Sequence, residues 1–210
     1  MAEPAASRPP RVVFCGLPSL LDPRSGAAIS MRTTLEMLAA RGFECHALTT
    51  TLFDGEDETD LGEIFGPKFD HETMRGRIVQ TERRDVVHQS YVTASTRSAD
   101  LTRSEGAAFR EHLARRLGEL APEIGVGFGS SAFSATLLAE VRRRVGQFVF
   151  YAANPSISNP DLVADGDVLL VPSAAQGERM RGRLGVEPEV FPSPVAGDRV
   201  PSPGSCIAAE

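Results

Sequence analysis

Apolar and polar positions along the chain follow two periods in turn, one typical of buried strands and one typical of amphipathic helices. Arg11–Gly16 and Gly166–Ser173 are short apolar runs closed by small residues, which is the form of a central parallel strand. The segment Ser104–Pro122 instead repeats its large apolar residues at helical spacing. These residues are Phe109, Leu113, Leu117 and Leu120. The alternation predicts a parallel sheet whose strands are joined by helices.

Seven strands and four helices are predicted from this pattern. The strands are Arg11–Gly16, Phe43–Thr50, Arg83–Ser95, Glu123–Gly129, Gln147–Asn154, Gly166–Ser173 and Pro188–Val195. The helices are Ala27–Gly42, Ser104–Pro122, Ser130–Gly146 and Ala174–Val186. Gly42 is suited to end the first helix, and Ser130 or Ser131 to cap the third. Leu52–Gln80 begins with an acidic run and is predicted to be a long excursion with little regular structure.

Strands that alternate with helices form a sheet covered on both faces and joined by right-handed crossovers. We therefore predict the α/β class: a three-layer, Rossmann-like domain with a mainly parallel sheet of about seven strands, over residues 11–195. Residues 1–10 lack the apolar core of a signal peptide and are expected to be a disordered leader. Residues 196–210 are rich in Pro, Gly and Ser and are expected to be a linker-like tail.

The acidic balance of the chain argues against a nucleic-acid partner. The 210 residues include 22 Lys and Arg against 28 Asp and Glu, which gives a net charge of -6. A nucleic-acid-binding protein needs a basic face to neutralise phosphates. No apolar run approaches the roughly 18 to 20 residues that span a bilayer. We expect a cytoplasmic protein with no transmembrane segment.

Residues that hold metals or attack substrates are scattered along the chain. The three cysteines lack the CxxC spacing of a zinc site, and no two of the four histidines lie at metal-ligand spacing. We expect no metal and no cofactor, and we assign no histidine to catalysis. Ser130 follows Gly127–Gly129, but the trailing glycine of a nucleophile elbow is missing and no histidine follows His112. A serine hydrolase is therefore disfavoured.

From the fourth predicted strand onward, the order of short motifs becomes distinctive. An acidic strand start after Pro122 leads to a glycine-containing strand end, a helix end with three arginines and a glycine, and then the runs FVFYAAN, DVLLVPS, RLGV and FPSPV. The first third adds Gly-Ala-Ala, a long helix ending in LAARG and the strand ECHALTT. Over Arg11–Val200 this order resembles the N-terminal domain of family 4 glycosyltransferases of the GT-B fold. Unrelated Rossmann domains lack the ordered VPS, LG and PSPV motifs.

The resemblance implies one half of a GT-B fold, the acceptor-binding domain of an enzyme that moves a hexose from a nucleotide-sugar to a hydroxyl acceptor. In such enzymes a second Rossmann domain binds the donor. That domain, in cis or in trans, is therefore an expected partner, and the nucleotide-sugar is an expected co-substrate beside the sugar acceptor. Without that donor-binding domain, the chain would be inactive. A homo-oligomer is a further candidate assembly.

Ligands of open α/β sheets bind outside the carboxyl ends of the strands, which places the candidate binding residues around one crevice. Those near the first strand are Gly16, Arg24, Gly26, Ala27, Ala28 and Arg32. Those after later strands are Gly129, Ser130, Ser131, Asn154 and Ser173. Small residues at the start of a helix would let a sugar diphosphate reach its amide N–H groups, and two arginines would add charge. The same small residues also suit a plain loop-to-helix junction, and Arg32 also suits a solvated helix position.

One departure from the resemblance leaves the chemistry open. Ala153 stands where a histidine is expected, although Asn154 matches. A polar donor near the anomeric carbon is therefore missing unless Ser130, Ser131 or Asn154 replaces it, and we assign no catalytic residue. The alternative is a non-catalytic glycosyltransferase-like domain that acts as a binding or assembly module. Another nucleotide-binding Rossmann protein is disfavoured because no GxGxxG follows the first strand.

Overall fold

Residues 8–55, 57–154, 162–164 and 166–194 are described by the computed structural model. The expected leader, residues 1–10, is described only from Arg8 onward. The expected tail, residues 196–210, lies outside the described residues. The domain boundaries inferred from the sequence therefore remain predictions.

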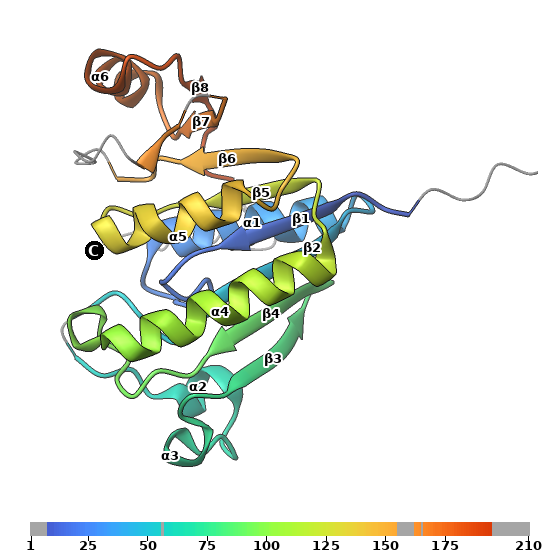
Figure 1. Ribbon diagram of the computed structural model, residues 1–210, viewed down its shortest axis with the longest axis vertical. Helices are drawn as coiled ribbons and strands as arrows, with labels where there is room; N and C mark the ends of the chain where they lie inside the picture. The colour runs from blue at the N-terminus through green and yellow to red at the C-terminus, as the bar shows by residue number, and fades with distance from the viewer. Residues whose placement is uncertain (1–7, 56, 155–161, 165, 195–210) are drawn as a thin grey trace, which may run out of the picture.

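Within the described residues, eight strands form one sheet in the order β3-β4-β2-β1-β5-β6-β7-β8 (Figure 1). They are β1 (Arg11–Cys15), β2 (Glu44–Thr50), β3 (Ile78–Arg83), β4 (Val86–Tyr91), β5 (Ile124–Gly127), β6 (Gln147–Tyr151), β7 (Val168–Val171) and β8 (Glu189–Val190). All neighbouring strands are parallel except β3 and β4. The predicted class, a mainly parallel α/β sheet, is confirmed.

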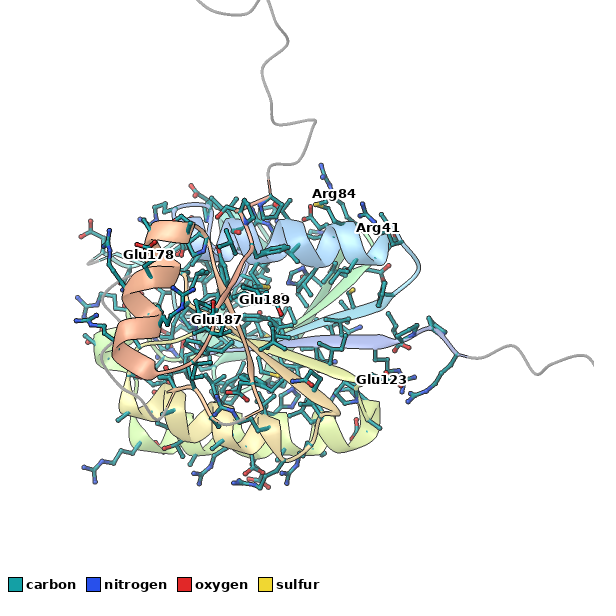
Figure 2. The ribbon with its side chains drawn as sticks, turned by 90° about the horizontal axis from the view of Figure 1, so that it is seen from above. Arg41, Arg84, Glu123, Glu178, Glu187 and Glu189 are labelled. Atoms are coloured by element: carbon teal, nitrogen blue, oxygen red, sulfur yellow. The ribbon has the colours of Figure 1, made fainter. Side chains whose placement is uncertain are left out.

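Helices cover both faces of this sheet, with α1 on one face and α4 and α5 on the other (Figure 2). The described helices are α1 (Gly26–Ala39), α2 (Leu61–Phe65), α3 (His71–Met74), α4 (Arg103–Leu120), α5 (Ala132–Arg142) and α6 (Ala174–Leu184), with a 3-10 turn at Ser98–Asp100. None of the helices in this part of the chain is long and apolar enough to cross a bilayer.

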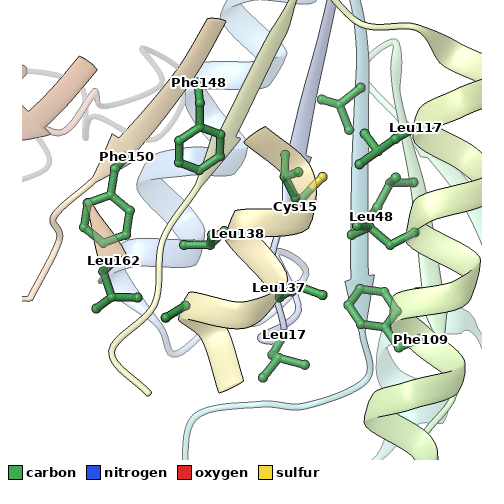
Figure 3. Close-up of a cluster of buried hydrophobic side chains, with 14 of the residues drawn as sticks. Cys15, Leu17, Leu48, Phe109, Leu117, Leu137, Leu138, Phe148, Phe150 and Leu162 are labelled. Carbon is green, nitrogen blue, oxygen red and sulfur yellow. The ribbon is translucent and has the colours of Figure 1, made fainter. Parts of the chain in front are cut away.

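The central strand β1 divides the core into two apolar clusters, because successive side chains of a strand point to opposite faces. Val12 and Phe14 belong to the cluster under α1, whereas Val13 and Cys15 belong to the cluster under α4 and α5. Figure 3 shows the second cluster, in which Phe109 of α4 approaches the sheet. Each fully buried Leu or Phe contributes about 1.5–3 kcal/mol. These clusters fix the helices whose first turns reach the carboxyl edge of the sheet.

The segment predicted to be an irregular excursion, Leu52–Gln80, is more ordered than the sequence indicated. Asp60 and Asp70 cap α2 and α3 with side-chain hydrogen bonds, and β3 begins at Ile78. β3 and β4 form a hairpin whose two-residue turn, Arg84-Asp85, has positive φ at both positions (48° and 62°). Such turns normally carry Asn-Gly or Asp-Gly. The absence of that signal explains why the sheet has eight strands where about seven were expected.

Candidate binding site

A cavity of about 720 Å³ lies at the carboxyl ends of β1, β2, β5 and β6. The chain passes from β1 to β2 on one side and returns to β5 on the other, so the winding of the sheet reverses between β1 and β5. Open α/β sheets bind their ligands at such a switch point. The volume is within the range of small-molecule sites. Helices α1, α4 and α5 all begin at the wall of this cavity.

The start of α1 contributes less to the cavity than the sequence indicated. Ser25 caps the helix by accepting a hydrogen bond from the Ala28 amide, and Ala27 lines the cavity. Ala28 is fully buried in the core, and a Cβ on Gly26 would meet no atom within 4 Å. Gly16 also faces the core, because a Cβ there would lie 2.9 Å from Cζ of Phe14. Gly16, Gly26 and Ala28 are not among the cavity-lining residues of the described chain.

The two arginines predicted near α1 are engaged elsewhere. Arg24 is exposed and donates a 2.6 Å hydrogen bond to Oγ1 of Thr59. Arg32 is only 9% exposed and donates a 2.8 Å hydrogen bond to the Leu20 carbonyl. Its guanidinium also lies 3.9 Å from the Glu36 carboxylate. Neither arginine is among the cavity-lining residues of the described chain. Arg32 is therefore a buried structural residue and not a solvated helix position.

The start of α5 forms a tighter wall. Of the two serines predicted as possible caps, Ser131 caps the helix by accepting a 3.0 Å hydrogen bond from the Ser134 amide. The two hydroxyls are also 2.9 Å apart. A Cβ on Gly129 would lie 2.5 Å from Cβ of Ser134, so the loop can wrap this closely only with glycine there. Gly129, Ser130, Ser131 and Ser134 all line the cavity.

A third wall is supplied by α4, which sequence reasoning did not connect with the site. Thr102 and Glu105 form a capping box at its start. Arg103, Ala107 and Arg110 line the cavity, and their spacing of four and three residues places them on one face of the helix. Both arginines are exposed, and neither guanidinium makes a hydrogen bond or ion pair with any residue that the structure describes. The spacing was visible in the sequence, but nothing in it showed that this face meets the sheet edge.

Aromatic rings line the cavity beside these polar groups. Phe128, Phe133 and Tyr151 are all lining residues, and Tyr151 is only 2% exposed. The Tyr151 hydroxyl lies 3.4 Å from Oγ of Ser30 and 3.2 Å from Oγ of Ser193, so it links α1 to the segment after β8. Tyr151 was not singled out from the sequence, where it is one more apolar position of a strand.

The residues after β6 complete the lining that sequence reasoning anticipated. Ala153 and Asn154 both line the cavity, and Asn154 is exposed. Ser173 does not line it in the described structure: its hydroxyl caps α6 by accepting a hydrogen bond from the Gln176 amide. Of the eleven candidate residues, the cavity brings together five. These are Ala27, Gly129, Ser130, Ser131 and Asn154.

A buried carboxylate joins two loops at the edge of the cavity. Asp22 is 1% exposed, and its two oxygens accept hydrogen bonds from the Arg24 amide at 2.8 Å and the Asp54 amide at 2.7 Å. These amides belong to the loops after β1 and β2. Asp54 is thereby held in the cavity wall, to which it adds an acidic side chain.

A second carboxylate holds the loop that leads into α4. Glu58 accepts hydrogen bonds from the Ser95 hydroxyl and from both the amide and the hydroxyl of Thr96. Partial burial raises the pKa of Glu58, but the hydrogen bonds from Ser95 and Thr96 outweigh it and lower the pKa to about 2. The carboxylate therefore stays ionised at neutral pH and keeps this loop beside the cavity.

Histidines do not contribute to the described cavity wall. Burial, together with Arg83 and Arg32, lowers the pKa of His88 to about 4. Burial and two neighbouring arginines likewise lower the pKa of His112 to about 4. Among the described residues, no group of three or more His, Cys, Asp and Glu side chains is placed to hold a metal ion.

Comparisons with known proteins leave the family open. No family model matches the sequence, and no curated protein matches it significantly. Among solved structures, the chain is similar to an E. coli protein described as "Trehalose-6-phosphate from E. coli bound with UDP-2-fluoro glucose", with 13% identity and a TM-score of 0.49. The match covers 89% of this chain and 49% of that one, so the chain spans about half the length of that protein. We therefore rest the functional proposal on the cavity and on the ordered sequence motifs.

Proposed function

We propose that this chain is the acceptor-binding domain of a glycosyltransferase, and that the cavity at the sheet edge holds the acceptor. The observation that carries the proposal is the position and lining of that cavity. It lies at the switch point of a mainly parallel sheet and combines aromatic rings with hydroxyl, amide and guanidinium groups. The order of motifs along the chain supports the same reading.

The mixture of aromatic and polar groups suits a sugar. A pyranose ring has apolar C–H faces that can lie against aromatic rings such as Phe128 and Phe133. Its hydroxyls need both donors and acceptors at its edge. Ser130, Asn154 and Asp54 offer both kinds of group around the same space. A purely apolar ligand would remove water from Ser130 and Asp54 without replacing its hydrogen bonds, at a cost of about 1–3 kcal/mol for each group.

The proposed reaction also needs a sugar donor, which we propose is bound outside this domain. An acceptor hydroxyl oxygen would bond to the anomeric carbon of a hexose while the bond from that carbon to the nucleoside diphosphate breaks. The hydroxyl proton would pass to a base or to a phosphate oxygen, and the diphosphate would leave as an anion. Catalysis requires positioned groups on both sides of the reacting atoms. We therefore propose that a second donor-binding domain, in cis or in trans, completes the site, with the nucleotide-sugar as co-substrate and no metal or other cofactor.

The proposal is tested by thermal-shift screening of the chain against mono- and disaccharide acceptors and against nucleotide-sugars. An acceptor present at 100 times its Kd should stabilise the domain by about 2.7 kcal/mol. For a domain of this size that corresponds to a Tm increase of roughly 5–11 °C. Nucleotide-sugars should give less, because the donor half is proposed to lie elsewhere.

A matched pair of variants ties any shift to the cavity. Ala107 lies in the cavity wall, so Ala107→Leu should abolish the shift by filling the space. Ala132 is an exposed alanine in the first turn of α5 that does not line the cavity in the described structure, so Ala132→Leu should leave the shift unchanged. Stabilisation by nucleotide-sugars alone, or a shift that Ala107→Leu leaves intact, would overturn the proposal.

The alternative of a non-catalytic binding or assembly module is favoured by Ala153, which stands in the cavity wall where the resemblance leads us to expect histidine. Sedimentation of the chain separates the two hypotheses. Tight self-association without stabilisation by any carbohydrate would support the assembly module.

A further inference from the structure

We infer that the ligand of the cavity carries a phosphate group, and that Arg103 and Arg110 of α4 bind it. This inference rests on the proposed function and names the substrate class of the same site: a phosphorylated sugar acceptor. It uses a part of the wall that the candidate residues around α1 did not include.

The geometry of α4 places both arginines in the same wall of the cavity. Arg103 and Arg110 are seven residues apart, which is two helical turns or about 10 Å along the axis. Both side chains are long enough to meet midway between them. Ala107 lies between the two on the same face and leaves that space open. Two arginines that flank a small residue in one cavity wall can therefore both reach a phosphate bound between them.

Among the residues that the structure describes, nothing pairs with the charge on these two arginines. Most arginines of the described chain are engaged: Arg32 by Leu20 and Glu36, for instance, and Arg142 by Asp167. Arg103 and Arg110 make no such bond within the described residues, although Arg115 and Arg116 of the same helix both pair with Glu119. Guanidinium groups bind phosphate oxygens through two parallel hydrogen bonds, which makes an unpaired pair at a cavity an effective phosphate site.

The neighbouring wall, at the start of α5, complements the same ligand. The loop at Ser130 and Ser131 offers hydroxyl groups, and α5 begins directly after it. In Figure 1, α4 and α5 lie side by side on one face of the sheet, and Gly106 of α4 leaves room for the Phe133 ring, which a Cβ would approach within 2.7 Å. The positive ends of both helix dipoles therefore lie near the arginines and favour an anion further. Asp54 adds a negative charge from the loop after β2, where it suits a sugar hydroxyl better than a phosphate.

The test is an NMR titration of the chain with inorganic phosphate, followed by glucose 6-phosphate, glucose and UDP. Inorganic phosphate should produce saturable shifts of the Ser130 and Ser131 amides and of the Arg103 and Arg110 Nε–H groups. Arg103→Gln with Arg110→Gln should weaken phosphate binding at least about 10-fold, the effect of losing roughly 1.4 kcal/mol of charge-assisted hydrogen bonding. Arg179→Gln is the matched control, because Arg179 is exposed on α6, away from the cavity lining, and has no hydrogen-bond or ion-pair partner among the described residues.

The outcomes separate this inference from the proposed function. Saturable phosphate shifts that vanish in the double variant and persist in Arg179→Gln support the inference. Tighter binding of glucose 6-phosphate than of inorganic phosphate or UDP assigns the phosphate to the acceptor, whereas preference for UDP overturns that assignment. If glucose shifts the cavity amides but phosphate does not, the inference fails and the proposed function stands. If phosphate binds through the arginines but no saccharide competes or adds affinity, the proposed function fails.

Discussion

Helices α1 and α4 both begin at the wall of the cavity, yet the fold treats the arginines of the two helices in opposite ways. Arg32 of α1 is buried and bonds to the Leu20 carbonyl and Glu36. Arg103 and Arg110 of α4 are exposed, line the cavity and have no partner among the described residues. The contrast shows that a helix start and a nearby arginine do not make a binding site. What matters is whether the arginine already forms hydrogen bonds or ion pairs with the protein's own carbonyl and carboxylate groups.

Glycines on the two sides of the cavity differ in the same way. A Cβ on Gly26, the first residue of α1, would meet nothing within 4 Å, whereas one on Gly129 would collide with Ser134 of α5. Glycine is therefore required for close packing on the α5 side and is dispensable at the start of α1. The tight contacts of the site lie where α4 and α5 meet the sheet edge.

The largest expected effect comes from Arg32→Met. The substitution leaves the Leu20 carbonyl and the 8% exposed Glu36 side chain short of a partner, so the free energy of unfolding should fall by about 3–5 kcal/mol. Arg84, 3.4 Å from Glu36, compensates in part and favours the lower end of that range. Urea unfolding measures the loss. Phosphate affinity of the folded fraction should be unchanged.

Arg110→Met is the matched substitution on α4, where the arginine lines the cavity. Its side chain is exposed, so the free energy of unfolding should change by no more than about 0.5 kcal/mol while phosphate affinity falls. The comparison would be reversed if Arg32→Met left stability intact but removed phosphate binding.

An intermediate effect is expected from Gly129→Ala. The new Cβ would lie 2.5 Å from Cβ of Ser134, and the shift of loop or helix should cost about 1–3 kcal/mol and weaken ligand binding. Gly26→Ala serves as its control. It should change the free energy of unfolding by no more than about 0.5 kcal/mol and should leave ligand binding unchanged. Thermal unfolding with and without phosphate measures both quantities. A loss of phosphate affinity in Gly26→Ala would show that the start of α1 belongs to the binding site after all.

The smallest expected effect concerns pH and Glu58. Its pKa is about 2 in the folded chain against an ordinary value of 4.5, so its stabilising contribution is present above about pH 4.5 and is lost as the pH falls toward 2. The side chain is about half exposed, which limits the effect to under about 1 kcal/mol. Urea unfolding should show wild type more stable than Glu58→Gln at pH 6 and nearly equal to it at about pH 2, where the folded-state carboxylate is itself being protonated. An equal difference at both pH values would contradict the assignment.

The alternation of apolar runs and helical stripes was enough to predict the α/β class, the parallel arrangement and most strand positions. Buried parallel strands must be apolar on both faces. Each such strand is therefore recognisable from a short run of consecutive apolar residues. The hairpin of β3 and β4 was not predicted, because its turn, Arg84-Asp85, lacks the Asn-Gly or Asp-Gly pair that such turns usually carry. The serine that caps α5 was predictable because capping acts between neighbours in sequence.

The composition of the cavity was decided by the tertiary structure. Gly129, Ser130, Ser131 and Asn154 could be placed near the cavity from the rule that ligands bind at strand ends. Arg103, Arg110 and Tyr151 could not, because their role depends on which face of α4 or β6 meets the switch point. Local sequence determines which residues form an element and which side is apolar. Only folding determines which arginine bonds to the protein's own carbonyl and carboxylate groups and which remains available to bind a ligand. The reason is that those partner groups can lie on other parts of the chain.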